Sequence, residues 1–94
     1  MTVIYLGQTT DVAVALPSDA TSTSYYFKFT DEYTKEVLTT TIQDNSVAKE
    51  RYSLFSIDAD AIGFETTGYY TAEIYNWDGS VVGDKIKEIY VNVI

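Results

Sequence analysis

The sequence predicts an all-β domain, a sandwich of about seven short antiparallel strands. Apolar and polar residues alternate in segments that recur at roughly ten-residue spacing, which is typical of strands joined by short turns. The chain contains nine tyrosines, and tyrosine favours the half-buried surface of a pleated sheet. The stretch from Thr66 to Val82 combines these signals, because an aromatic strand follows a glycine and an Asp78-Gly79 turn leads into a second apolar run.

The first half of the chain contains four expected strands. Val3–Leu6 is a short uncharged apolar run, which suits a sheet edge. Asp11–Leu16 alternates valine or leucine with alanine, so one of its faces is expected to be buried. Ser22–Thr30 alternates aromatic with polar residues around Phe27. Glu36–Gln43 is β-branched and largely polar, so we expect at most one modest buried face.

The second half contains three expected strands and one helical turn. Arg51–Ile57 alternates again, and Asp58–Gly63 indicates a short helical turn. Gly68–Asn76 and Lys85–Val93 then form the closing hairpin. Gly83-Asp84 interrupts the last hairpin and predicts a β-bulge there.

One domain is expected over residues 1–94, because the single proline and five glycines provide no linker. A chain of this length buries about 60–65% of its unfolded surface, which is enough for an independent core. The sequence has no cysteine, so neither a disulfide nor thiol chemistry is expected. It also has no histidine, the commonest general base and the commonest transition-metal ligand.

The spacing Gly68-x-Tyr70 resembles the element that begins the sixth strand of immunoglobulin-like sandwiches. The resemblance implies that Tyr70 is a buried corner residue whose hydroxyl bonds the backbone between residues 62 and 65. It also implies core positions, filled in antibody domains by two cysteines and a tryptophan, for Val14, Ala72 and Phe27.

Strand alternation then predicts an outer surface. If Tyr70 points inward, its neighbours point outward, and the third and last strands add residues to the same face. Four tyrosines are expected to share this solvent-facing surface: Tyr26, Tyr69, Tyr75 and Tyr90. Trp77, at the tip of the closing hairpin, either folds back over the sandwich or forms an exposed anchor. Tyrosines tolerate half-exposure in strands and also favour interfaces, so a passive surface and a contact surface both remain open.

The net charge and the motifs argue against several classes of function. The net charge is −8 and the six basic residues are scattered, so no nucleic-acid partner is expected. No signal peptide or membrane segment is expected. Asp58-Ala59-Asp60 resembles the start of a calcium loop, but Ile62 and Tyr69 stand where ligands are required, so no metal site is expected. Without histidine no Ser-His-Asp triad forms, and we expect no enzyme and no cofactor.

The chain also resembles small immunoglobulin-like accessory proteins of tailed bacteriophages. This resemblance rests on Gly68 to Tyr75, on Trp77-Asp78-Gly79, on Val81-Val82 and on Ile89-Tyr90-Val91. It implies a decoration protein on the capsid, or a protein at a fibre or baseplate attachment point. The implied partner is the major capsid protein, another virion protein or a second copy, and the implied location is the virion after synthesis in the host cytoplasm.

Two other functions remain open at this stage. An exposed aromatic face suits a carbohydrate-binding or adhesion module, because aromatic rings stack on sugars. An intracellular protein-interaction subunit is the third hypothesis.

Overall fold

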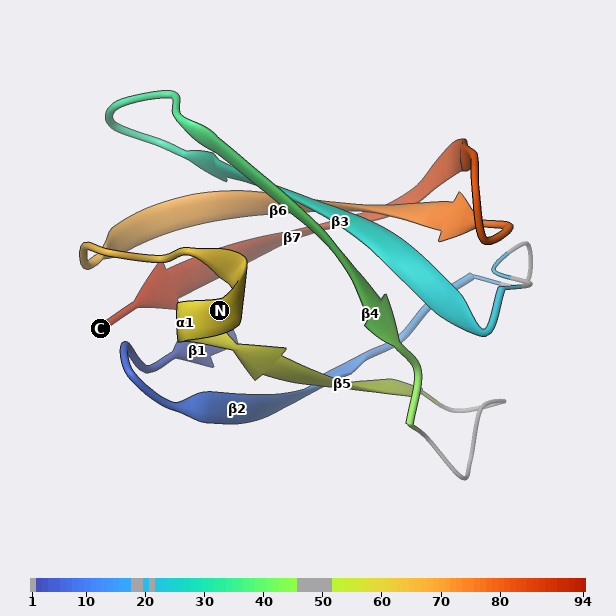
Figure 1. The fold of residues 1–94 in the computed structure, drawn as a ribbon, viewed down its shortest axis with the longest axis horizontal. Helices are drawn as coiled ribbons and strands as arrows, with labels where there is room; N and C mark the ends of the chain where they lie inside the picture. The colour runs from blue at the N-terminus through green and yellow to red at the C-terminus, as the bar shows by residue number, and fades with distance from the viewer. Residues whose placement is uncertain (1, 18–19, 21, 46–51) are drawn as a thin grey trace.

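A computed structural model of the protein describes residues 2–17, 20, 22–45 and 52–94. Over these residues the chain is all-β, with seven strands and one helical turn (Figure 1). In chain order the elements are β1 (Thr2–Ile4), β2 (Thr9–Val14), β3 (Ser24–Asp31), β4 (Val37–Gln43), β5 (Ser53–Asp58), α1 (Ala59–Ile62), β6 (Gly68–Trp77) and β7 (Val82–Val93).

The strands form two sheets that face each other. One sheet has five strands in the order β1-β7-β6-β3-β4, and the other has two, β2 and β5. In Figure 1, β3, β6 and β7 lie in the upper layer, whereas β2 and β5 lie below, and β4 crosses the front towards β5. The core fills the space between these layers.

The expectation that all strands pair antiparallel is wrong for β1, which runs parallel to β7. The Ile94 N–H donates to the Ile4 carbonyl at 2.9 Å, and the Leu6 N–H donates to the Ile94 carbonyl at 2.8 Å. These two strands come from opposite ends of the chain. No tight turn joins them, so local sequence does not determine their relative direction.

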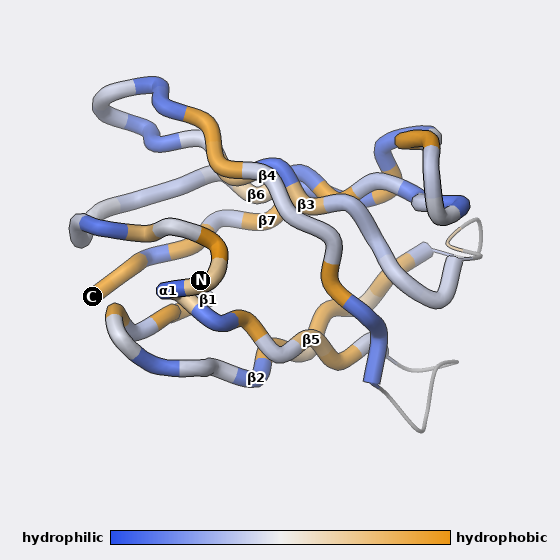
Figure 2. Tube along the Cα trace, viewed as in Figure 1, coloured by the Kyte–Doolittle hydropathy of each residue, from blue (hydrophilic) through white to orange (hydrophobic). Residues whose placement is uncertain are grey.

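Aromatic side chains from both sheets meet in the core. Phe27 of β3 and Phe55 of β5 lie with ring centroids 4.8 Å apart at 75°, an edge-to-face contact across the two layers. Figure 2 shows apolar residues in the strands of both layers. The three positions that the resemblance assigns to the core are all buried: Val14, Phe27 and Ala72.

Local signals account for the helical turn and the closing hairpin. The Asp58 carboxylate accepts from the N–H groups of Asp60 and Ala61 at 3.1 and 3.2 Å, so it caps α1. The Asp78 carboxylate likewise accepts from Ser80 and Val81 at 2.9 and 2.7 Å and closes the β6–β7 loop. These bonds hold the pKa of Asp78 below its usual range.

Several element boundaries differ from expectation. β1 and β2 begin and end earlier than expected, at Thr2–Ile4 and Thr9–Val14. Arg51, the expected start of the fifth strand, lies outside the described residues. Asp44 follows β4 directly, and it is buried and accepts from the Leu54 N–H at 3.0 Å. This bond links the end of β4 to β5.

Candidate functional site

The residues predicted to face outward lie on one face of the five-stranded sheet. Tyr26 of β3 pairs with Tyr75 of β6, and Thr71 of β6 pairs with Tyr90 of β7. Residues that alternate with them, such as Phe27 and Ile74, are fully buried on the opposite face. Strand pleating therefore separates an inner aromatic core from an outer polar and aromatic surface.

Tyr26 contacts two other aromatic residues of this outer face. The Tyr26 ring lies 5.9 Å from the Tyr75 ring at 68°, and 6.1 Å from the Trp77 ring at 24°. All three side chains are half-buried. Trp77 therefore folds back onto the sheet and stacks on Tyr26, one of the two arrangements expected from sequence. We call Tyr26, Tyr75 and Trp77 the aromatic cluster.

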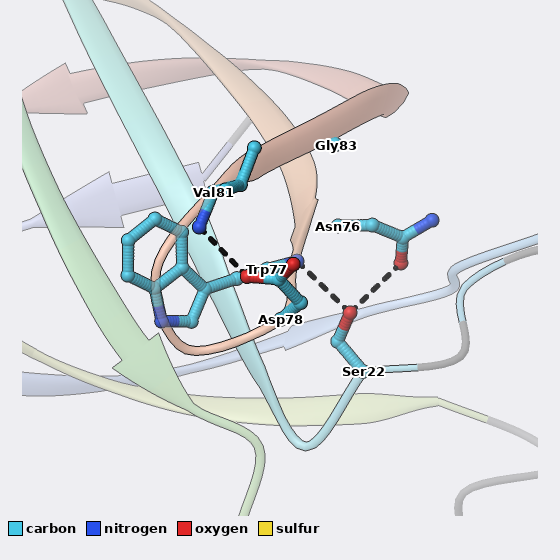
Figure 3. A pocket seen from close by; sticks show the side chains of 6 residues that line it. All are labelled: Ser22, Asn76, Trp77, Asp78, Val81 and Gly83. Atoms are coloured by element: carbon cyan, nitrogen blue, oxygen red, sulfur yellow. Dashed lines mark hydrogen bonds between the residues drawn. The ribbon is translucent and has the colours of Figure 1, made fainter.

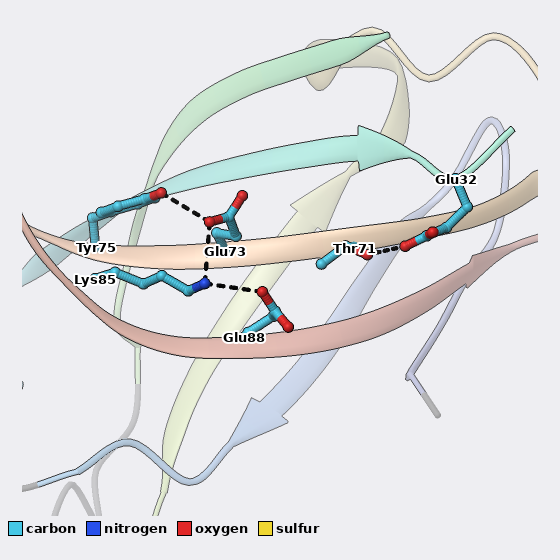
Figure 4. Close-up of polar contacts among 6 residues, drawn as sticks. All are labelled: Glu32, Thr71, Glu73, Tyr75, Lys85 and Glu88. Atoms are coloured by element: carbon cyan, nitrogen blue, oxygen red, sulfur yellow. Dashed lines mark hydrogen bonds and ion pairs between the residues drawn. The ribbon is translucent and has the colours of Figure 1, made fainter. Parts of the chain in front are cut away.

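A charged bridge of Glu73, Lys85 and Glu88 lies beside the aromatic cluster (Figure 4). The Lys85 Nζ is 3.2 Å from Glu73 Oε2 and 2.9 Å from Glu88 Oε1. The Tyr75 hydroxyl donates to Glu73 Oε2 at 3.0 Å and connects the cluster to the bridge. The bridge separates the aromatic cluster from the remaining tyrosines of the face.

A β-bulge places Lys85 in this bridge. The register between β6 and β7 shifts after Ile74, which pairs with Lys87, so that Tyr75 pairs with Lys85. Unbroken alternation would place Lys85 on the same face as Ile89, Val91 and Val93, which is the inner one. The extra residue, Ile86, turns the Lys85 side chain outward. A second register shift, between Tyr75 and Trp77, falls at Gly83-Asp84, where the sequence predicts a bulge.

Tyr69 and Tyr90 form the exposed part of the face, and we call them the exposed pair. Their side chains are 57% and 59% exposed. Tyr69 pairs with Asn92 and Tyr90 pairs with Thr71, so the two tyrosines are diagonal neighbours on adjacent strands. The single tyrosine group expected from sequence is therefore divided into the aromatic cluster and the exposed pair.

An open pocket of about 300 Å³ lies at the hairpin end of the sheet (Figure 3). Ser22, Asn76, Trp77 and Asp78 contribute to its lining. The Ser22 hydroxyl accepts from the Trp77 N–H at 2.9 Å and donates to Asn76 Oδ1 at 3.1 Å. Sequence reasoning missed Ser22, because a lone serine before a strand gives no signal of a partner far along the chain.

The predicted corner residue Tyr70 is buried, with 5% of its side chain exposed, and it follows Gly68 at the start of β6. Its hydroxyl interacts with the side chains of Asp31 and Thr66, and burial raises its pKa. Its polar neighbours are therefore these two side chains, rather than the backbone between residues 62 and 65 where the resemblance implies a partner. Asp31 lies opposite Tyr70 in the β3–β6 register, which explains the partner.

No metal or membrane feature is found in the part of the chain that the structure describes. Residues 2–17, 20, 22–45 and 52–94 contain no cluster of three carboxylate, thiol or imidazole side chains arranged to hold a metal ion. The same ranges contain no helix with the length and apolarity needed to cross a membrane.

Comparison with known proteins gives no match. No protein-family model, curated protein or solved structure matches the chain significantly.

The charged bridge predicts a pH dependence of stability. Lys85 holds the pKa of Glu73 below its ordinary 4.5, so this stabilisation is complete above pH 4.5 and is lost as the pH falls through the folded value. Glu88 and Glu73 raise the pKa of Lys85 above its ordinary 10.5, so its contribution is lost only as the pH rises past that higher value. Thermal unfolding midpoints from pH 3 to 7 are expected to fall less steeply with acid in Lys85→Gln than in wild type. Identical profiles of unfolding midpoint against pH in the two proteins would contradict the charged bridge as a cause of the acid dependence.

Proposed function

We propose that the protein is a non-enzymatic binding protein with an immunoglobulin-like fold, which docks on a virion protein through the outer face of its five-stranded sheet. Two strands, β2 and β5, form one sheet, whereas β3, β6 and β7 are neighbours in the other. This distribution supports the fold, because immunoglobulin sandwiches separate strands B and E from strands C, F and G. β1 departs from that arrangement, since it lies beside β7 rather than with β2.

The observation that carries the docking proposal is the combination of exposed and pre-ordered aromatic side chains on one face. The exposed pair offers large side chains of low conformational entropy, which is typical of interface anchors. The aromatic cluster, on the other side of the charged bridge, is held by ring contacts and by the Tyr75–Glu73 hydrogen bond. A partner that binds here therefore meets side chains that are already largely ordered, which lowers the entropic cost of association.

The virion is the proposed location of this partner, and the major capsid protein is the proposed partner. The support is the resemblance of the β6–β7 hairpin to phage accessory proteins. The net charge of −8 suits such a role, because it disfavours contact with the packaged nucleic acid. The aromatic side chains then supply most of the affinity.

The test is co-sedimentation with assembled capsids of the phage whose genome encodes the chain. Tyr69→Ser/Tyr90→Ser is expected to weaken capsid affinity by about 30-fold or more, the equivalent of one lost hot spot. Tyr75 is a poorer probe, because it is half-buried and bonded to Glu73. Tyr33→Ser is the matched control, since Tyr33 lies in the β3–β4 loop with 93% of its side chain exposed.

Circular dichroism and thermal unfolding establish that all three proteins remain folded. Equal occupancy of capsids by wild type and the folded double variant would contradict docking through this face. Failure of the wild type to sediment with capsids would contradict the capsid as partner.

The pocket beside Trp77 favours a carbohydrate ligand as the second candidate. It combines an indole edge with the hydroxyl of Ser22, the amide of Asn76 and the carboxylate of Asp78, groups that suit sugar hydroxyls. A glycan array tests this second function. Specific glycan binding by the wild type that is lost in Trp77→Ala would support it. Genes for capsid or tail proteins beside the coding sequence would favour the first proposal, and polysaccharide-utilisation genes the second.

A further inference from the structure

The free edge of the five-stranded sheet is β4. The sheet ends with this strand, and within the described residues no strand pairs with its outer side. β4 is seven residues long and contains no charged residue. The opposite edge, β1, has only three residues. Exposed edges usually carry a charge, a bulge or a short strand that blocks pairing, and β4 has none of these devices.

The hydrogen bonds at the two ends of β4 determine which backbone groups are free. The Asp31 N–H donates to the Glu36 carbonyl at 2.8 Å, and the Asp44 N–H donates to the Thr23 carbonyl at 3.0 Å. Even-numbered residues of β4 therefore direct their backbone groups towards β3. The odd-numbered residues direct theirs away from the sheet, and these are Val37, Thr39, Thr41 and Gln43.

The sequence of β4 is nearly symmetric about its centre. When a second β4 runs antiparallel about Thr40, Thr39 lies opposite Thr41 and Val37 lies opposite Gln43. The free backbone groups then face one another in this register, because both members of each pair are odd-numbered. Leu38 lies opposite Ile42, so these two apolar side chains also meet each other, whereas Val37 meets the polar Gln43.

Space for an added strand exists beside β4. An open groove of about 320 Å³ is lined by Thr40, Thr41, Ile42 and Gln43 from β4 and by Ser56, Asp58, Ala61 and Ile62 from β5 and α1. The lining also includes Asn45, whose N–H donates to the Leu54 carbonyl at 2.8 Å, so the free edge of β4 ends at Gln43.

The net charge of the chain limits the surfaces through which two copies can meet. Two copies of net charge −8 repel one another over most of their surface. Within β4 no charged side chain opposes another across the two-fold axis, and the nearest like charges are Glu36 and Asp44, which lie opposite each other just beyond its two ends. A self-complementary edge with closed two-fold symmetry fits a second copy of the same chain.

We propose that the protein forms a homodimer in which β4 of one copy pairs antiparallel with β4 of the other about Thr40. The two sheets then continue as one sheet, and both outer faces point to the same side. This inference does not depend on the proposed function. If that function holds, the dimer presents two contact faces to one particle, which strengthens binding through avidity.

Sedimentation velocity of the full chain over a concentration series tests the dimer. Wild type is expected to convert reversibly from monomer to dimer, and dimerisation is expected to tighten from about 0.01 M to about 0.1 M salt as repulsion is screened. Thr39→Glu/Thr41→Glu places like charges opposite each other in the proposed register. It is expected to raise the dimer dissociation constant by at least about tenfold.

A charge reversal tests the register. Thr39→Lys/Thr41→Lys is also expected to be monomeric alone, and an equimolar mixture of the two variants is expected to dimerise, because Glu then faces Lys in every pair. Thr9→Glu/Thr67→Glu is the control, since it adds the same charge at exposed positions outside β4. All variants are checked for the wild-type circular dichroism spectrum.

A monomeric wild type at every concentration and salt level would overturn the proposal. A dimer that survives in the folded Thr39→Glu/Thr41→Glu variant would also overturn it, as would failure of the mixed variants to associate.

Discussion

Phe27→Ala is expected to lower the free energy of unfolding by about 3–5 kcal/mol, the usual cost of removing a buried aromatic ring. Phe27 has no exposed surface and contacts the rings of Phe29 and Phe55 at centroid distances of 5.8 and 4.8 Å. Because Phe55 belongs to the other sheet, the substitution removes a contact between the layers as well as apolar burial. Urea unfolding followed by circular dichroism measures the loss.

The neighbouring Lys28→Ala is the matched control for Phe27. Lys28 lies one residue along the same strand on the outer face and is half-buried. Its substitution is expected to change stability by less than about 1 kcal/mol, the usual range for residues outside the core. Comparable losses of stability in Phe27→Ala and Lys28→Ala would contradict the assignment of Phe27 to the inner face and Lys28 to the outer face of β3.

Tyr70→Ala is expected to cost about 3–5 kcal/mol, whereas Tyr70→Phe is expected to cost about 1–2 kcal/mol. The ring packs edge-to-face on Phe64 at 4.9 Å, and Tyr70→Phe keeps this contact. Only the hydroxyl is lost in Tyr70→Phe, which removes its interactions with Asp31 and Thr66. The difference between the two variants therefore separates ring packing from the polar interactions of the hydroxyl at the corner.

Tyr69→Phe provides the control for the hydroxyl at Tyr70. Tyr69 is the preceding residue, but it points outward and is 57% exposed, so its hydroxyl is free to bond water. Removal of this hydroxyl is expected to change the free energy of unfolding by no more than about 0.5 kcal/mol, the usual range for surface substitutions. An unchanged midpoint in Tyr70→Phe would contradict the corner role and leave Tyr70 as a packing residue only.

Self-pairing of β4 and docking through the outer face use different surfaces, so the two proposals are separable. The β4 variants change Thr39 and Thr41, whereas the docking variant changes Tyr69 and Tyr90 on β6 and β7. A variant that loses self-association but still binds capsids with lower avidity would indicate that the dimer amplifies docking.

The sequence alone determined the secondary structure and the phase of most strands, because a period of two is a local property of each segment. Phe27 and Tyr70 are buried, and Tyr69 and Tyr90 are exposed, as alternation predicts. Local capping also follows from sequence, since the Asp58 carboxylate bonds groups only two and three residues away. The all-β class follows from the same local information.

Only the tertiary structure decided which outward residues touch one another. The bulge in β7 brings Lys85 to the outer face, where it binds Glu73 and divides the predicted tyrosine group. Trp77 stacks on Tyr26, and β1 runs parallel to β7, through contacts between segments far apart in the chain. Such contacts depend on strand order and register, which arise when separate strands pair, and no local pattern encodes them.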